Sequence, residues 1–143
     1  MKKKRIPYAV SNLEQIRSGN YYFVDKTEYL EKLENYITPV FLRPRRFGKT
    51  LWCSIQECFY DINRKEKFQE LFGDTYIGKN PTAEQGKYMV LRLNFSSVQV
   101  SEDKEEIEYN FNFITGCDFA LFCSYYKNIL NNNRNLLKMD SIV

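Results

Sequence analysis

The sequence predicts an α/β domain of three layers, in which helices cover both faces of a mainly parallel sheet. Two observations lead to this prediction. Short runs of strand-forming residues alternate along the chain with stretches whose apolar residues recur at helical spacing. In addition, 43% of the 143 residues are apolar and 16% are aromatic, a composition that supports a packed core rather than disorder.

The first part of the chain is expected to contain two strands separated by a helix. Residues 21–24 are rich in strand-forming types. An acidic turn that starts at Asp25 and has Glu28 three residues later is typical of a helix N-terminus, which predicts a helix over residues 25–36. Residues 40–42 form a short apolar run between two prolines, and this pattern predicts a buried strand.

Two helices are expected next. The first begins near Gly48, because apolar residues then recur on one helical face: Leu51, Ile55, Cys58, Phe59 and Ile62. The second is a short helix around residues 68–72 that ends at Gly73.

The second half predicts a loop, one long strand and two helices. Residues 78–86 contain Asn-Pro between two glycines and are read as the loop, and residues 88–95 are the longest strand candidate. A helix with an acidic first turn begins at Ser101 and ends at Gly116. A last helix aligns Phe119, Phe122, Tyr126, Ile129 and Leu130, and residues 131–135 form a polar tail.

Several function classes are excluded by composition. The chain has no histidine, so histidine-dependent nucleophile or acid–base chemistry is ruled out. No apolar run approaches the ~20 residues that span a bilayer, and the basic N-terminus does not lead into a signal peptide, so no membrane partner and a cytoplasmic location are expected. The spacing of Cys53, Cys58, Cys117 and Cys123 fits no common zinc site and predicts reduced thiols.

Gly48, Lys49 and Thr50 match the second half of a phosphate-binding loop, which reads Gly, four variable residues, then Gly-Lys-Ser/Thr. Arg43 stands at the first glycine position, so the strict pattern is not met. The context nevertheless has the required order of strand, loop and helix. In this interpretation Lys49 is the catalytic residue that meets the outer phosphates of ATP, and the Thr50 hydroxyl ligates Mg²⁺.

The loop is unusually basic. Its predicted nucleotide-binding residues are Arg43, Arg45, Arg46, Phe47, Gly48, Lys49, Thr50 and Leu51. The three arginines either pair with phosphate oxygens, as an arginine finger does, or form a solvated patch or salt bridges to acidic helices; both alternatives stay open. Phe47 is expected to pack against the first helix more than to touch the nucleotide.

Residues 43–51 read Arg-Pro-Arg-Arg-Phe-Gly-Lys-Thr-Leu and closely resemble the modified Walker A loop of the bacterial AAA-ATPase-like family. Two further segments are similar to that family: Ile6-Pro7-Tyr8 with residues 22–27, and residues 91–96. The resemblance implies a P-loop NTPase-like fold, ATP as the nucleotide and a bacterial cytoplasmic setting. Members of the family commonly carry a nuclease-like domain of the PD-(D/E)XK type further along the chain.

The chain departs from the family pattern at two points. Asn94 stands where the family typically has Asp, and no apolar run ends in the acids of a Walker B strand, since Asp118, Asp103 and Glu105 lie outside any strand candidate. We therefore expect a domain truncated before the Walker B strand, with residues 1–37 as a leading segment and residues 38–143 as a partial P-loop domain. An incomplete sheet has an unpaired edge, which predicts self-association into a homo-oligomer.

Three functional hypotheses follow. The first is an ATP-hydrolysing domain, and the second is a nucleotide-binding or interaction module without turnover, because the acids that support hydrolysis are missing. The third is a nucleic-acid-associated protein that uses residues 2–5 and the loop arginines. The net charge of only +3 and the lack of alternating aromatic and basic residues give the third hypothesis no support.

Overall fold

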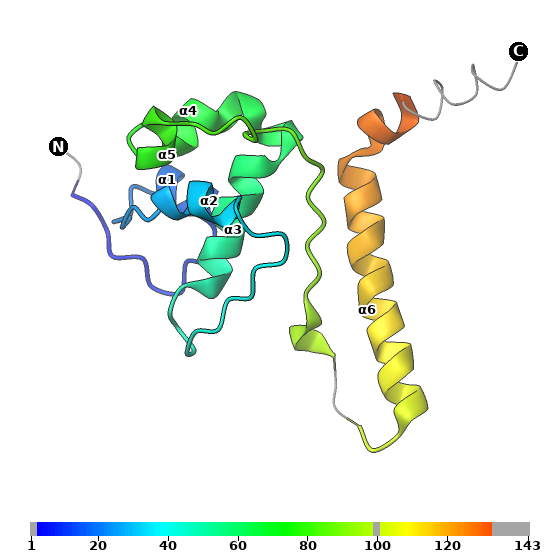
Figure 1. Cartoon of the computed structure of the whole chain (residues 1–143). Coiled ribbons are helices and arrows are strands. Elements are labelled where there is room, and N and C mark those ends of the chain that lie inside the picture. Colours follow the sequence, from blue (N-terminus) through cyan, green and yellow to red (C-terminus); the bar gives the residue numbers. More distant parts are fainter. Residues whose placement is uncertain (1–2, 99–100, 133–143) are drawn as a thin grey trace, which may run out of the picture. The chain divides into compact units, whose positions relative to one another are not determined.

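The computed structural model describes residues 3–98 and 101–132. The chain divides into two units, Met1–Met89 and Val90–Val143, and helices dominate the described part of each (Figure 1). The first unit contains, in order, α1 (Leu13–Ser18), α2 (Glu28–Leu33), α3 (Lys49–Tyr60), the 3₁₀ helix η1 (Ile62–Lys67), α4 (Phe68–Phe72) and α5 (Tyr76–Lys79). The second unit contains the 3₁₀ helix η2 (Phe95–Ser97) and α6 (Lys104–Tyr125).

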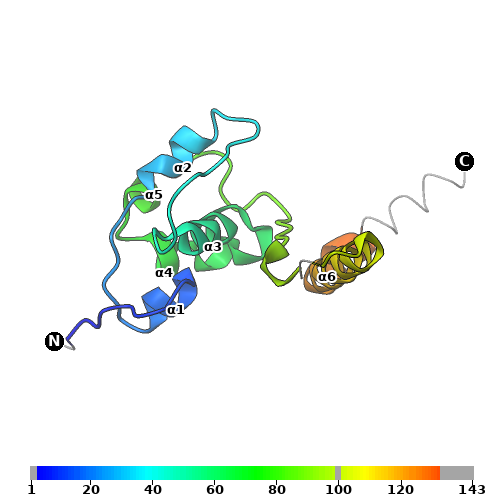
Figure 2. The same cartoon turned by 90° about the horizontal axis from the view of Figure 1, so that it is seen from below.

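Helix α3 is the centre of the first unit. It buries one face, which carries Ser54, Ile55, Cys58 and Phe59. Helices α1 and α4 contact α3 directly, whereas α2 and α5 pack against each other (Figure 2). Because most of these helices have only four to six residues, their stability comes from packing on the apolar face of α3 rather than from helix propensity.

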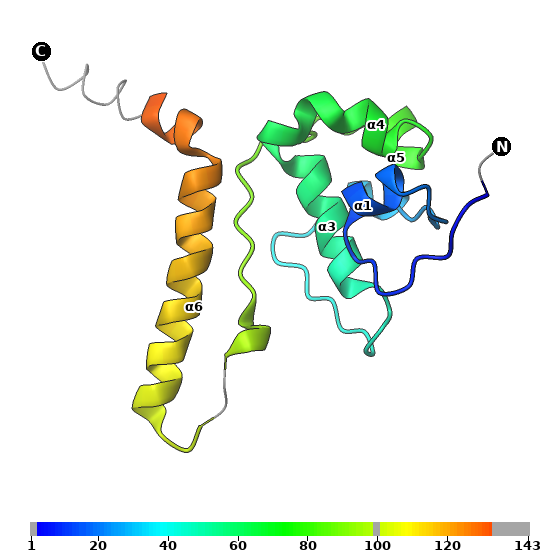
Figure 3. The ribbon, with the colours of Figure 1, turned by 180° about the vertical axis from the view of Figure 1, so that it is seen from behind.

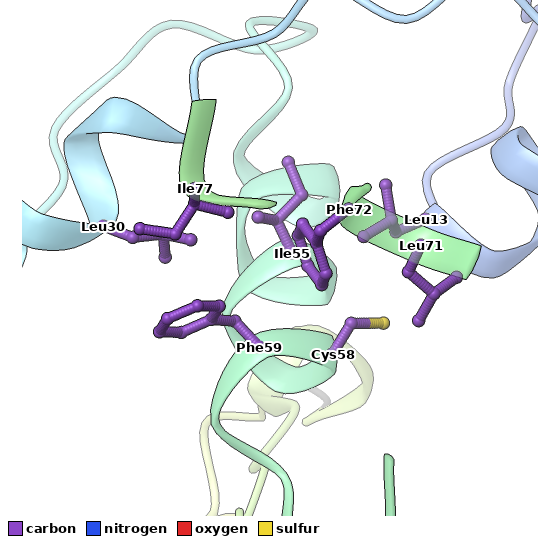
Figure 4. Close-up of a cluster of buried hydrophobic side chains, with 8 residues drawn as sticks. All are labelled: Leu13, Leu30, Ile55, Cys58, Phe59, Leu71, Phe72 and Ile77. Atoms are coloured by element: carbon purple, nitrogen blue, oxygen red, sulfur yellow. The ribbon is translucent and has the colours of Figure 1, made fainter. Parts of the chain in front are cut away.

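Eight buried side chains form the core of this unit (Figure 4). They come from α1, α2, α3, α4 and α5 and are Leu13, Leu30, Ile55, Cys58, Phe59, Leu71, Phe72 and Ile77. Phe59 is fully buried and meets Phe72 edge to face at 6.0 Å between ring centroids. The core therefore joins helices from both ends of the unit onto α3.

Hydrogen bonds to the side chains of Ser54, Asp25 and Thr27 tie the short helices together. Ser54 Oγ on α3 accepts a hydrogen bond from Leu13 N at 3.0 Å. Asp25 accepts from Thr27 N at 2.9 Å and from Tyr76 N at 2.7 Å, while Thr27 Oγ1 accepts from Ile77 N at 3.1 Å. These bonds join the beginning of α2 to the beginning of α5. Burial raises the pKa of the Asp25 carboxyl, but the hydrogen bonds from Thr27 and Tyr76 outweigh burial and leave the pKa below its usual value.

Asp25→Asn is expected to lower the free energy of unfolding at pH 7 by about 1 kcal/mol. The amide has one oxygen in place of two, so it cannot accept hydrogen bonds from both Thr27 N and Tyr76 N as the carboxylate does. A lowered folded-state pKa stabilises the protein above the ordinary carboxyl pKa of about 4, and the stabilisation is lost as pH falls through the lowered value. Urea unfolding measured from pH 7 to pH 2.5 should therefore show that the free energies of unfolding of wild type and of Asp25→Asn converge at acid pH. A gap that stays constant over this range would contradict the role given to the ionised carboxylate.

The predicted three-layer fold with a parallel sheet is wrong. Over residues 3–98 and 101–132 the structure contains two isolated parallel bridges, Arg5 with Tyr21 and Asp61 with Tyr88, and no strand. Residues 40–42 have no regular secondary structure and are not buried, since Val40 is 80% and Leu42 is 89% exposed. The segment 88–95 pairs at Tyr88 alone.

The prediction of a sheet failed because the apolar runs do not determine which segment each would pair with. A short apolar run shows that burial is favourable, but it does not specify a partner strand, and a parallel sheet needs ladder hydrogen bonds between segments distant in sequence. In the first unit the apolar face of α3 is instead covered by other helices. The self-association expected from an incomplete sheet edge loses its basis for the same reason.

Two helices predicted in the first unit are confirmed. The helix expected near Gly48 is α3, and the short helix that ends at Gly73 is α4. The helix predicted over residues 25–36 is shorter, since α2 covers Glu28–Leu33, and Ile62 lies in η1 rather than in α3. Asp25 does not cap α2 in the expected way, because Thr27 is the residue that precedes the helix.

In the second unit one long helix replaces the predicted pair. Helix α6 continues through Gly116 and breaks at Tyr126, and residues 127–132 are again helical. Residues 90–94 run beside α6 (Figure 3), held by Asn94 N on Asp118 Oδ2 at 3.0 Å and Val90 N on Tyr126 Oη at 2.9 Å. Of the predicted polar tail, residues 133–135 lie outside the described residues. Within the described part of the chain, no helix is both long and apolar enough for a membrane span.

Candidate functional site

The predicted phosphate loop leads into the N-terminus of α3 (Figure 1). Gly48 caps the helix with φ 75° and ψ 20°, a left-handed conformation that glycine adopts without strain. Arg46, two residues earlier, also has a positive φ of 67°. A Cβ atom added at Gly48 would have no neighbour within 4 Å, so the glycine is required here by the backbone angle and not by crowding.

The start of α3 presents free backbone donors. The first helical bond runs from Trp52 N to Gly48 O at 2.8 Å, so the preceding N–H groups of α3 have no partner inside the helix. No side chain caps them. Lys49 extends across the loop, and its Nζ donates to Arg43 O at 2.6 Å, closing a ring of residues 43–49. The arrangement supplies N–H groups and one ammonium at a positive helix end, which suits an anion.

The three loop arginines are all exposed, and none of them forms a salt bridge with any residue that the structure describes. The alternative in which Arg43, Arg45 and Arg46 neutralise acidic helices therefore has no support among these residues. Their charge faces solvent together with Lys49.

A cavity of about 410 Å³ lies beside the loop. It is bounded by the N-terminal stretch, the start of α2 and the start of α3. Its lining is mostly apolar and aromatic, with Tyr22, Tyr29, Phe41, Phe47 and Trp52 among the rings. The charged residues of the lining are all cationic: Lys26, Arg43 and Lys49.

The structure brings together part of the predicted set. Around this one cavity lie Arg43, Phe47, Gly48, Lys49 and Leu51. Arg45, Arg46 and Thr50 are exposed on the loop and the first turn but do not line the cavity. Phe47 is 66% exposed and lines the cavity together with Tyr29 of α2.

The aromatic residues that line the cavity were not predicted as site residues. Tyr22, Phe23, Tyr29, Phe41 and Trp52 were assigned to strands and helices and not to a site. A signal was present, because residues 22–27 form one of the two other segments that resemble the ATPase-like family.

Thr50 is the residue predicted to ligate Mg²⁺. Its hydroxyl suits a phosphate-bound Mg²⁺, which usually keeps several waters and takes one or two carboxylates. Among the described residues, no group of three or more Asp, Glu, Cys or His side chains is gathered to hold a metal ion.

All four cysteines are free thiols. Burial raises the pKa of the Cys58 thiol, and the Arg64 guanidinium beside it opposes that rise.

The loop and the cavity define a helical unit in which a helix N-terminus without a side-chain cap lies next to an aromatic cavity. Residues 7–141 match the model of the AAA-ATPase-like family, described as "Predicted AAA-ATPase". The chain belongs to this family. No curated protein and no solved structure matches it.

Proposed function

We propose that the chain binds ATP, with its phosphates held by the loop that precedes α3. One observation carries the proposal: Gly48 turns the backbone at the start of α3, where N–H groups without a side-chain cap and Lys49 follow three loop arginines that form no salt bridge with any described residue. Membership of the ATPase-like family supports the choice of a nucleotide as the anion.

In this proposal the Lys49 ammonium gives up its bond to the neutral carbonyl Arg43 O and pairs with the outer phosphates, whose negative charge makes the contact stronger. The first-turn N–H groups of α3 hold an inner phosphate. The Thr50 hydroxyl is the group on this chain that would face Mg²⁺, which neutralises phosphate charge when it is bound.

The direct test is titration calorimetry of the full chain with ATP and Mg²⁺. We expect saturable 1:1 binding that weakens only moderately as salt rises. Absence of binding would overturn the proposal. A steep salt dependence of DNA binding, with no ATP binding, would favour the nucleic-acid hypothesis instead. Phosphate release measured on the same samples separates an ATPase from a binding module without turnover.

Removal of the loop arginines is expected to distinguish ATP from ADP. Arg45→Ala and Arg46→Ala should each weaken ATP binding about ten-fold and ADP binding less, because the γ-phosphate is present only in ATP. Arg45→Lys and Arg46→Lys are the matched controls, since they keep the charge and, at position 46, the same positive-φ backbone constraint. Equal losses for both nucleotides would assign the arginines a general electrostatic role.

A further inference from the structure

We infer that the aromatic cavity beside the loop receives the purine base of the bound nucleotide. The inference rests on the proposed function, because the loop must hold the phosphates for the base to reach the cavity. It adds a set of contacts, from the N-terminal stretch, α2 and residue 41, that the phosphate-loop pattern does not contain.

The size and the walls of the cavity fit a base. Its volume of about 410 Å³ lies in the range of about 300–1,000 Å³ typical of small-ligand sites. Six aromatic residues line it (Tyr22, Phe23, Tyr29, Phe41, Phe47 and Trp52), and bases bind proteins by stacking on such rings. A purine has two fused rings, so it covers more of this surface than a pyrimidine does.

The rings are left partly uncovered by the protein itself. Tyr22 is 57%, Tyr29 is 47% and Phe41 is 47% exposed, although each lines the cavity. Phe41 lies 6.0 Å from Trp52 between ring centroids, at an interplanar angle of 41°. These two rings are therefore not stacked on each other, and Phe41 keeps about half of its surface exposed at the cavity.

The cavity and the anion site are contiguous. Arg43, Gly48 and Lys49 belong both to the loop and to the cavity lining. With three cationic residues and no acidic one, the lining favours a ligand that is flat and apolar at one end and anionic at the other. A nucleotide has this form, whereas an apolar peptide would leave the cations without a partner.

Trp52 supplies a hydrogen-bond donor next to the cavity. Its indole Nε1–H is buried and has no hydrogen-bond partner among the described residues. Ring nitrogens of a purine are acceptors, so a small rotation of the indole upon binding would give this donor a partner. Trp52 is also the only tryptophan in the sequence, so its fluorescence reports on the cavity directly.

The experiment compares ATP with inorganic tripolyphosphate, both with Mg²⁺, by calorimetry and by Trp52 fluorescence. We expect ATP to bind about ten-fold more tightly than tripolyphosphate, because tripolyphosphate lacks the stacked base. ATP should also bind more tightly than CTP. Phe41→Ala and Tyr29→Ala should weaken ATP about ten-fold and leave tripolyphosphate unchanged. Lys49→Ala should weaken both ligands.

The outcomes separate the two proposals. If ATP and tripolyphosphate bind wild type equally, or if both ring variants keep the wild-type ratio of the two affinities, the base does not occupy this cavity and the inference is overturned, while phosphate binding stands. If neither ligand binds, the proposed function fails and the inference fails with it. Tripolyphosphate binding by each ring variant shows that the variant is folded, and the ATP–CTP comparison on wild type needs no variant at all.

Discussion

Phe59→Ala should lower the free energy of unfolding of the first unit by about 3–5 kcal/mol, the largest effect we expect from any single substitution in this chain. Phe59 is fully buried at the middle of the core, where its ring contacts Phe72 edge to face and lies 6.2 Å from Phe68. Removal of the ring loses both its transfer free energy and its contacts across the space left behind.

Urea unfolding followed by circular dichroism measures this change in the full chain. Tyr36→Ala is a matched control, because it also removes an aromatic ring but Tyr36 is 68% exposed. We expect the control to change stability by less than about 0.5 kcal/mol. A loss below about 1 kcal/mol for Phe59→Ala would show that the packing of α3 against α4 is not what stabilises the unit.

The local features of the site were predictable from sequence because they depend on neighbouring residues. The periodic apolar face of α3 needs only a helix to be read, and Gly48 before Lys49 specifies where that helix begins. The absence of a sheet from the described residues was not predictable, because the runs at residues 40–42 and 88–95 give no information on whether they have a partner strand. The prediction that a helix ends at Gly116 was also wrong. A glycine within a helix weakens it only by about 1 kcal/mol, and α6 continues through this residue.

The cavity was missed because its wall is assembled from three separate segments. Tyr29 lies on α2, Phe41 precedes the loop and Trp52 lies on α3. Each aromatic residue taken alone reads as a core residue. Hydrogen bonds accepted by Asp25 and Thr27 fix the start of α2 against α5, and the bond from Leu13 N to Ser54 Oγ fixes α1 against α3. That placement depends on tertiary contacts, which periodicity does not encode.

Lys49→Ala should weaken ATP binding about ten- to a hundred-fold, which corresponds to ~1.5–3 kcal/mol for a hydrogen bond to a charged group. Lys49 is the residue that joins the loop to the helix: its Nζ reaches back to Arg43 O at 2.6 Å, and the residue itself begins α3. An alanine at this position keeps the helix, because alanine is the best helix former, and removes the ammonium together with the methylene chain that carries it.

Titration calorimetry with ATP and Mg²⁺ measures the loss, with Lys79→Ala as the control. Lys79 is exposed in the last turn of α5 and does not line the cavity, so its removal deletes the same charge from the first unit without touching the loop. The control should bind ATP within about two-fold of wild type, since an exposed charge at a distance is screened by salt. If both variants bind like wild type, the loop does not hold the phosphates. If both lose affinity equally, net charge and not the geometry at Gly48 attracts the nucleotide. A loss confined to Lys49→Ala, with an unchanged melting temperature, assigns the phosphates to the N-terminus of α3.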